Sequence, residues 1–284
     1  MASIVRREAL FHPLPGARDV AFDGAMNRAE RRRKSKDDEQ TLKNGIDADS
    51  SDPAGTAAMT RLMSDLLDAA KRDRNIEPPV KFLHAKVDAT LHAMRNLRVD
   101  CKKGCAHCCR VWVSATIPEV LFIAKSLRRR NDVALAERVG AAHRITGAYD
   151  FISRQGLHQQ CPLLADDLCS VYETRPVSCR FWASTNVAAC LRVFRQSSGE
   201  SVPTPMTHLK GRGAYEIALS LALKHVGLPH YYYELNAALT RALEHPDAES
   251  AWLGGEDVFK DVRRDPHDVS TDTVSRQLYK FAFA

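Results

Sequence analysis

The chain has 284 residues, of which 44% are apolar and 27% are charged, as is ordinary for a globular protein. This length allows one sizeable hydrophobic core, or a core with a tail. No stretch approaches the ~20 consecutive apolar residues that a helix needs to span a bilayer, and the N-terminus lacks the apolar segment of a secretory signal. We therefore expect a soluble, cytoplasmic protein with no membrane partner.

The net charge is +6, but the first 55 residues carry ten basic and ten acidic side chains. Within them a basic run over 28–36 precedes an acidic run over 37–52. Arginine and lysine runs can bind phosphates, but no aromatic side chain interleaves this run as a base-stacking surface requires. We expect residues 1–55 to be a disordered, self-neutralising tail, and nucleic acid is not an expected partner.

The elements that follow the tail are predicted to be helices. Apolar residues spaced by three and four begin near Thr56, and Pro78-Pro79 is expected to end that helix. A second helix is predicted from about Phe82 to Leu97. Together these make an N-terminal helical segment over 56–100, which leads into the first cysteines.

Helices are also predicted after the first cysteine group. Ile117-Pro118-Glu119 is typical of a helix start, with proline in the first turn and an acid near the positive helix end. Further helices are expected over 132–153, 176–182, 186–195, 205–226 and 230–244, and a loop over 156–176. We find no alternation of strands and helices, so the predicted class is all-α with irregular cysteine-rich loops. The predicted units are a cysteine-cluster domain over 100–182 and a helical region over 183–284 packed on it.

Seven of the eight cysteines lie between positions 101 and 179. In a reducing compartment such clustering indicates metal ligation or redox chemistry before disulfides. Short spacings let the thiolates of one loop converge on one metal, and thiolates bind zinc or the iron of iron–sulfur clusters. The predicted metal ligands are Cys101, Cys105, Cys108, Cys109, Cys161, Cys169 and Cys179.

Seven thiols exceed the four of a tetrahedral zinc site or a four-cysteine cluster, so either two metals or one metal with spare thiols is implied. Cys108 and Cys109 are adjacent, so their side chains tend to point in different directions. Cys190 lies on the apolar side of the 186–195 helix and is expected to be a small buried hydrophobe.

Several neighbours of these cysteines have predicted roles. Basic side chains that stand beside them are expected to lower thiol pKa values; they are Lys102, Lys103, His107, Arg110, Arg175 and Arg180. Asp166 and Asp167 are expected to form a turn between two cysteines. Phe181 and Trp182 are expected to shield the site from water.

Three segments of this pattern together resemble the CxxCxxCC family, the YkgJ-like cysteine-cluster proteins. They are Gly104-Cys105-x-x-Cys108-Cys109, Cys161-Pro162-Leu163-Leu164 to Cys169-Ser170-Val171-Tyr172, and Arg175-Pro176-x-x-Cys179-Arg180. The resemblance covers about residues 100–182 and implies a zinc- or iron-chelating domain, but no particular reaction. This sequence has three residues between Cys101 and Cys105 where the family has two, so Cys101 is the less well matched position.

The same stretch is distantly similar to flagellin lysine N-methylases, in Trp112 and in the Cys-Pro-Leu-Leu segment. An iron–sulfur-dependent protein-modifying enzyme is therefore one alternative, and a structural zinc module of an interaction protein is another. The first three cysteines also have the CxxxCxxC spacing of radical S-adenosylmethionine enzymes, but those need a β/α barrel, and helices are predicted here. Catalytic residues, and any protein partner or substrate, stay open.

Overall fold

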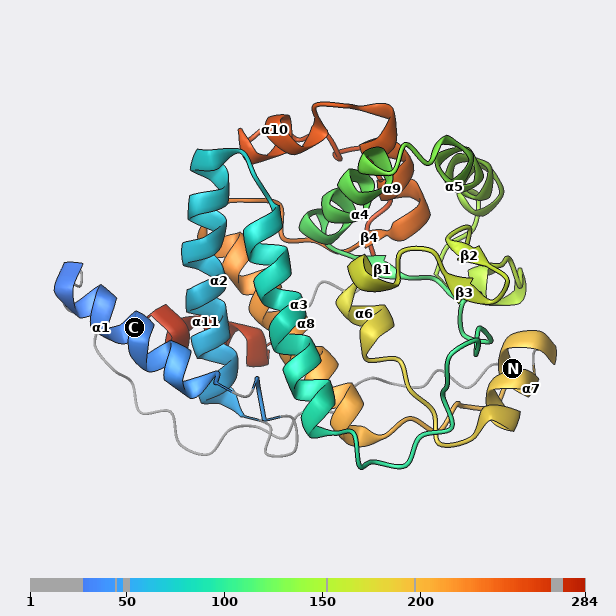
Figure 1. Ribbon diagram of the computed structural model, residues 1–284, viewed down its shortest axis with the longest axis horizontal. Helices are drawn as coiled ribbons and strands as arrows, with labels where there is room; N and C mark the ends of the chain where they lie inside the picture. The colour runs from blue at the N-terminus through green and yellow to red at the C-terminus, as the bar shows by residue number, and fades with distance from the viewer. Residues whose placement is uncertain are drawn as a thin grey trace.

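The computed structural model describes residues 28–43, 45–47, 52–151, 153–196, 198–266 and 273–283. Within these ranges the secondary structure is almost entirely helical, which confirms the predicted all-α class (Figure 1). The helices are α1 (Arg28–Thr41), α2 (Pro53–Asp73), α3 (Glu77–Ala93), α4 (Ile117–Arg129), α5 (Val133–Thr146), α6 (Val177–Arg180), α7 (Val187–Gln196), α8 (Met206–His225), α9 (Leu235–Glu244), α10 (Ala248–Leu253) and α11 (Thr273–Phe283).

Two short 3-10 helices, Ser153–Gly156 and Tyr172–Thr174, and four strands of two residues each complete the secondary structure of the described residues. Strand β1 (Ser114–Ala115) pairs antiparallel with β4 (Tyr233–Glu234). Strand β2 (Leu164–Ala165) pairs with β3 (Leu168–Cys169) in a tight hairpin. Both pairs lie beside the cysteine-rich segments, so they hold loops in place and build no extended sheet.

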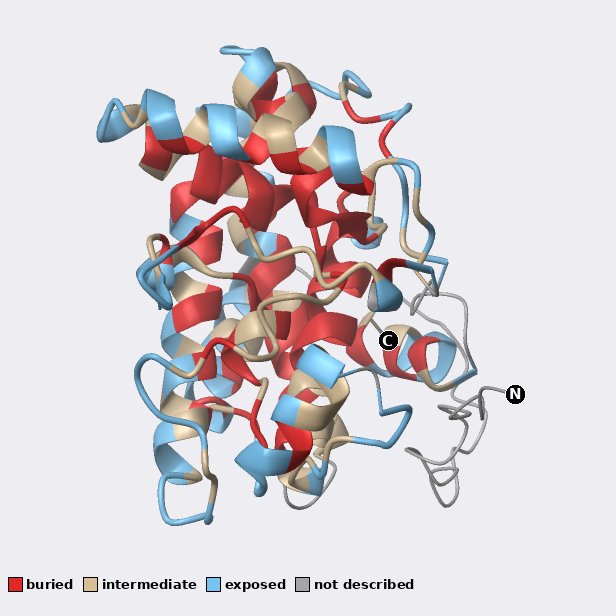
Figure 2. Ribbon diagram, turned by 90° about the vertical axis from the view of Figure 1, so that its right-hand side faces the viewer, coloured by how far each residue is buried: buried red, intermediate tan, exposed pale blue. Residues whose placement is uncertain are grey.

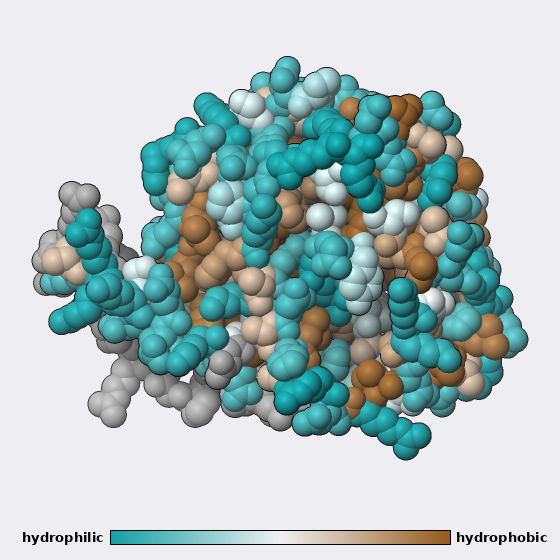
Figure 3. All heavy atoms as spheres, in the orientation of Figure 1, coloured by the Kyte–Doolittle hydropathy of each residue, from teal (hydrophilic) through white to brown (hydrophobic). Residues whose placement is uncertain are grey.

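One hydrophobic core joins the two halves of the chain. Helix α2 packs against α8, α1, α11 and α3, while α9 packs against both α4 and α5. The buried cluster extends along the sequence from Leu42 to Val262. Buried residues gather on the inner faces of these helices (Figure 2), and hydrophilic side chains cover most of the outer face shown in Figure 3, with apolar patches between them.

The start of the described chain differs from the sequence-based expectation. Residues 28–41 are helical, and Asp38 of α1 forms an ion pair with Arg61 of α2 at 2.5 Å. Leu42 and Ile46 are buried in the main core. The expectation of an unstructured segment is therefore wrong for residues 28–41, because these apolar residues anchor a highly charged helix. Residues 1–27, 44 and 48–51 of the predicted tail lie outside the described residues.

The proline pair begins a helix and does not end one. Helix α2 stops at Asp73, and Arg74 takes a left-handed conformation with φ 51°. Pro78 and Pro79 lie in the first turn of α3, where a backbone N–H has no intrahelical acceptor and its loss costs little. The predicted start of α4 is confirmed by a capping box between Thr116 and Glu119.

Other boundaries differ in length. The helix predicted over 132–153 ends at Thr146, and the predicted loop over 156–176 contains the β2–β3 hairpin. Besides α1, the helices α10 and α11 were not predicted. Across the described ranges, no helix combines the length and apolar character that crossing a bilayer requires.

Candidate metal centre

All seven predicted ligand cysteines line one cavity of about 800 Å³. Cys101 to Cys109 come from the segment between α3 and β1, Cys161 precedes the hairpin and Cys169 lies on β3. Cys179 lies on α6. Cys101 and Cys179, which are 78 positions apart in the sequence, thus line the same cavity.

Backbone hydrogen bonds hold the first cysteine segment against the second. The N–H of Cys161 donates to the carbonyl of Cys109 at 2.8 Å. Within the first segment, the N–H of Cys105 donates to the carbonyl of Lys102 at 2.9 Å, across a turn in which Gly104 has φ +83°. A side chain at this position would be strained, so glycine is the residue that suits this tight turn.

The hairpin that carries Cys169 turns at Asp166 and Asp167, as predicted. Both have positive φ, 50° and 58°, which aspartate tolerates better than most residues and which a two-residue hairpin requires. This turn sets Leu164 opposite Cys169 in the pairing register.

Arginines from neighbouring segments bind the backbone of this second loop. Arg138 of α5 donates to the carbonyls of Pro162 and Leu164, the latter at 2.7 Å. Arg130 donates to the carbonyl of Ser170 at 2.7 Å. These charge-assisted bonds fix the backbone on both sides of the hairpin.

A buried glutamate connects α4 to the helix that carries Cys179. Glu119 is 1% exposed, and its Oε2 accepts from the N–H and the hydroxyl of Thr116 at 2.9 and 2.8 Å. Its Oε1 accepts from the N–H of Val177, the first residue of α6, at 2.8 Å. Both carboxylate oxygens are therefore used, and Cys179 follows Val177 by two residues.

Arg180 acts as a buried clamp and not as a free charge beside the sulfurs. Its Nη1 pairs with Asp88 at 2.7 Å, and its Nε donates to the carbonyl of Arg175 at 3.1 Å. A third contact joins its Nη2 to Nδ1 of His84 at 3.1 Å. These bonds tie the start and end of the Cys179 segment to α3.

Burial dominates the acidity of most of these thiols. It raises the pKa of Cys179 to about 12, and it raises the pKa values of Cys161 and Cys169. A hydrogen bond from the Cys108 thiol raises the pKa of Cys108 and lowers that of Cys109, whose pKa Arg175 lowers further. The predicted effect of basic neighbours on thiol pKa therefore holds for Cys109, whereas desolvation outweighs the effect of Arg175 at Cys169 and Cys179.

The donor set fits zinc or iron in its chemistry, because thiols supply most of the available ligands. In the described part of the chain, however, no three His, Cys, Asp or Glu side chains lie close enough together to hold an ion as they stand. Sulfurs bound to one zinc lie within about 4 Å of each other, given Zn–S bonds near 2.3 Å. Metal binding therefore requires the thiols to turn towards the middle of the cavity, which has room for that movement.

Several other residues of this cavity were not predicted to line it, among them Cys190, Arg212 and Leu235. Cys190 is 4% exposed, as expected of a buried hydrophobe, but it also contributes to the wall. Arg212 and Leu235 reach the cavity from α8 and α9, and the sequence offers no signal for them because both are distant from any cysteine. Of the two predicted shielding residues, Trp182 lines the cavity, whereas Phe181 packs in the core against Tyr215.

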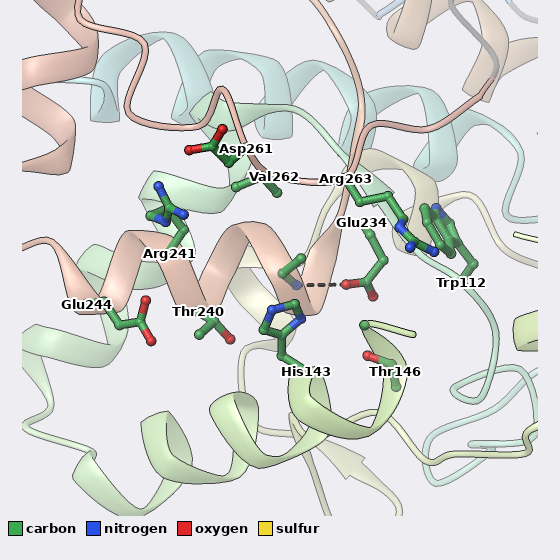
Figure 4. A pocket seen from close by; sticks show the side chains of 12 residues that line it. Trp112, His143, Thr146, Glu234, Thr240, Arg241, Glu244, Asp261, Val262 and Arg263 are labelled. Carbon is green, nitrogen blue, oxygen red and sulfur yellow. Dashed lines mark hydrogen bonds between the residues drawn. The ribbon is translucent and has the colours of Figure 1, made fainter. Parts of the chain in front are cut away.

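A second, smaller cavity of about 290 Å³ lies between α5, α9 and residues 261–263 (Figure 4). Its walls are mostly polar and include His143, Glu234 and Arg263. Trp112 lines both cavities. The indole therefore separates the cysteine cavity from this polar one.

Comparison with known proteins agrees with the geometry. Residues 100–197 match the family model CxxCxxCC, described as "Putative zinc- or iron-chelating domain". This range begins just before Cys101 and ends one residue after α7, so it contains all eight cysteines. No curated protein and no solved structure matches the chain.

Proposed function

We propose that this chain binds a metal centre through the cysteines of the cavity, and that the centre is an iron–sulfur cluster in preference to a single zinc ion. The observation that carries the proposal is the arrangement of the sulfurs. Seven thiols surround one cavity of about 800 Å³, which is more space than a single zinc ion enclosed by four ligands fills. A cluster of several irons bridges thiolates that lie farther apart than those of one tetrahedral ion.

Electrostatic interactions between the ionised forms of the cysteines indicate which of them lie near one another. Cys109 acts electrostatically on Cys161, on Cys169 and on Cys179. Cys101 interacts in the same way with Cys105, Cys190 and Cys108. We infer that Cys109, Cys161, Cys169 and Cys179 hold the cluster, with Cys108 beside them, and that Cys101 and Cys105 line its entrance.

Anaerobic purification followed by analysis of iron, acid-labile sulfide and zinc tests the proposal. We expect brown protein in which iron and sulfide are present in similar amounts. Cys179→Ser should lose most of the iron, whereas Cys190→Ser, a matched loss of a buried thiol, should keep it. Colourless protein with tightly bound zinc would replace the cluster by a zinc site, and folded protein that takes up no metal would end the proposal.

A catalytic role is the second proposal, and it depends on the likeness to flagellin lysine N-methylases in Trp112 and the Cys-Pro-Leu-Leu segment. The space in the cavity favours it, because a purely structural zinc site is closed. Cluster-dependent transfer of labelled methyl groups from S-adenosylmethionine to protein in a cell extract would support this role. No incorporation above that of the Cys179→Ser variant would refute it.

A further inference from the structure

Four buried side-chain nitrogens of residues that line the cysteine cavity lack a hydrogen-bond partner among the described residues. One of them, Nδ1 of His107, can donate or accept, whereas the other three can only donate. These three donors are Nε of Arg175 and the indole Nε1 atoms of Trp112 and Trp182. Trp112 is itself 6% exposed. Arginine and indole N–H groups donate and never accept. Because an unpaired buried donor is unfavourable, the group that completes this wall is an acceptor.

The charge of Arg175 also lacks a carboxylate partner in the described structure. The other two arginines of the cavity are paired, Arg180 with Asp88 at 2.7 Å and Arg212 with Glu216 at 2.6 Å. Arg175 forms no such ion pair, and its guanidinium lies 3.8 Å over the ring of Tyr172. Stacking on this ring holds the planar group in place and leaves its edge available to a bidentate oxyanion.

Arg175 and Trp182 stand at the two ends of the short helix that carries Cys179. Arg175 precedes α6 and Trp182 follows it. Both residues line the same cavity as Cys179, so a molecule that meets both donors shares that cavity with the proposed metal ligands.

The volume of the cavity exceeds what a metal needs. At about 800 Å³ it falls among pockets that enclose small organic molecules, which span roughly 300–1,000 Å³. Much of the remaining wall is apolar, with Val113, Leu163, Leu164, Val171 and Leu235. A ligand with an apolar body and one anionic end matches such a wall.

We propose that the cysteine cavity binds a small organic oxyanion, a carboxylate or a phosphate monoester on an apolar body, beside the metal centre, with Arg175 and Trp182 donating to its oxygens. This inference rests on the proposed metal-binding function and names the class of molecule that the centre meets. Water can accept from the same donors when the ligand is absent, and the anion displaces it.

Calorimetric titration of the full-length, metal-loaded protein tests the inference. The probes are phenylacetate and phenyl phosphate, with neutral phenylacetamide as the control for the apolar body. We expect at least one anion to bind about tenfold or more tightly than the amide, as charge-assisted hydrogen bonds imply. The anion that binds tighter identifies the oxyanion class.

Arg175→Gln should weaken anion binding by about tenfold or more and leave amide binding unchanged. The control is Arg72→Gln, which replaces an exposed arginine of α2 and should change neither anion binding nor amide binding. Trp182→Phe keeps the ring and removes the donor, so it provides a second test, with about threefold to tenfold weaker binding expected. Anion binding that is no tighter than amide binding, or that survives in both cavity variants, overturns the inference. Metal analysis of the same samples separates the two proposals. Wild-type protein that contains no metal refutes the proposed function. Metal-loaded protein that binds neither anion refutes this inference alone.

Discussion

Replacing Glu119 by glutamine tests whether the interior of the protein positions Cys179. The carboxylate accepts three hydrogen bonds, two from Thr116 on one oxygen and one from the N–H of Val177 on the other. A glutamine side chain has the same shape but only one acceptor oxygen. If that oxygen serves Thr116, the amide NH₂ faces the N–H of Val177, and two donors meet in a buried site.

The cost follows from this geometry. One hydrogen bond to a charged acceptor is lost and one buried donor is left unpaired, which together amount to about 2–3 kcal/mol. For a chain of this size we expect the midpoint of thermal unfolding to fall by about 4–10 °C. The start of α6 is released at the same time, so retention of metal should fall by about tenfold or more, as for other residues that orient a ligand.

Thermal unfolding and metal exchange against a chelator, measured side by side, provide the readout. Glu137→Gln, an exposed position on α5, removes the same charge and should leave both quantities unchanged. An unfolding midpoint equal to that of the wild type would refute the assignment of Glu119 as a buried three-bond acceptor. A lower midpoint with unchanged metal exchange would refute only its connection to Cys179.

Three other predictions follow from the same structure. In the metal-free protein, burial raises the pKa of Cys179 to about 12 from an unfolded value near ~8.5, so the stability that this thiol contributes is intact below about pH 8.5 and is lost as pH rises towards 12. Its share of the loss between pH 7.5 and pH 10 is about 2 kcal/mol, and the other buried thiols add to the total. Urea unfolding should therefore show a loss that is smaller by about 2 kcal/mol in Cys179→Ser than in the wild type. Burial, helped by Arg180 and Arg175, lowers the pKa of His84 to about 3. The stability that neutral His84 contributes above about pH 6.5 should therefore decline as pH falls towards 3, by about 2 kcal/mol between pH 7 and pH 5. The His84→Asn variant should lose this pH dependence. Arg138→Ala removes the donors to the second cysteine loop and should speed metal loss to a chelator by about tenfold. Arg144→Ala, at an exposed position of the same helix, should leave the rate of metal loss unchanged. Equal rates in the two variants would contradict the role of Arg138 in holding that loop.

The features that could be predicted from the sequence depend on residues close together in the chain. The capping box needs only Thr116 and Glu119, three positions apart, and the hairpin turn needs only Asp166 and Asp167. Such interactions are formed within one turn of backbone, so the residue types carry most of the information. The cysteine spacing belongs to the same class, since each group is compact.

The features that could not be predicted join distant segments. The bond from Val177 to Glu119 spans 58 positions, and Arg212 reaches the cavity from α8. Helix α1 is a further case, because its charge pattern alone favours a solvated chain. Only the burial of Leu42 and Ile46 against other helices outweighs that tendency, and the neighbours that bury them lie elsewhere in the sequence.

The cavity combines a fixed backbone with side chains that are not yet arranged for a metal. The N–H of Cys161 is bound to the carbonyl of Cys109, Arg130 and Arg138 hold the second loop, and Glu119 holds α6. The sulfurs themselves are not grouped for an ion within the described residues. Rotation about a cysteine side chain is cheap compared with refolding a loop. Metal binding should therefore act on thiol orientation and protonation while the helices stay in place, unlike small zinc domains, in which the metal and the fold form together.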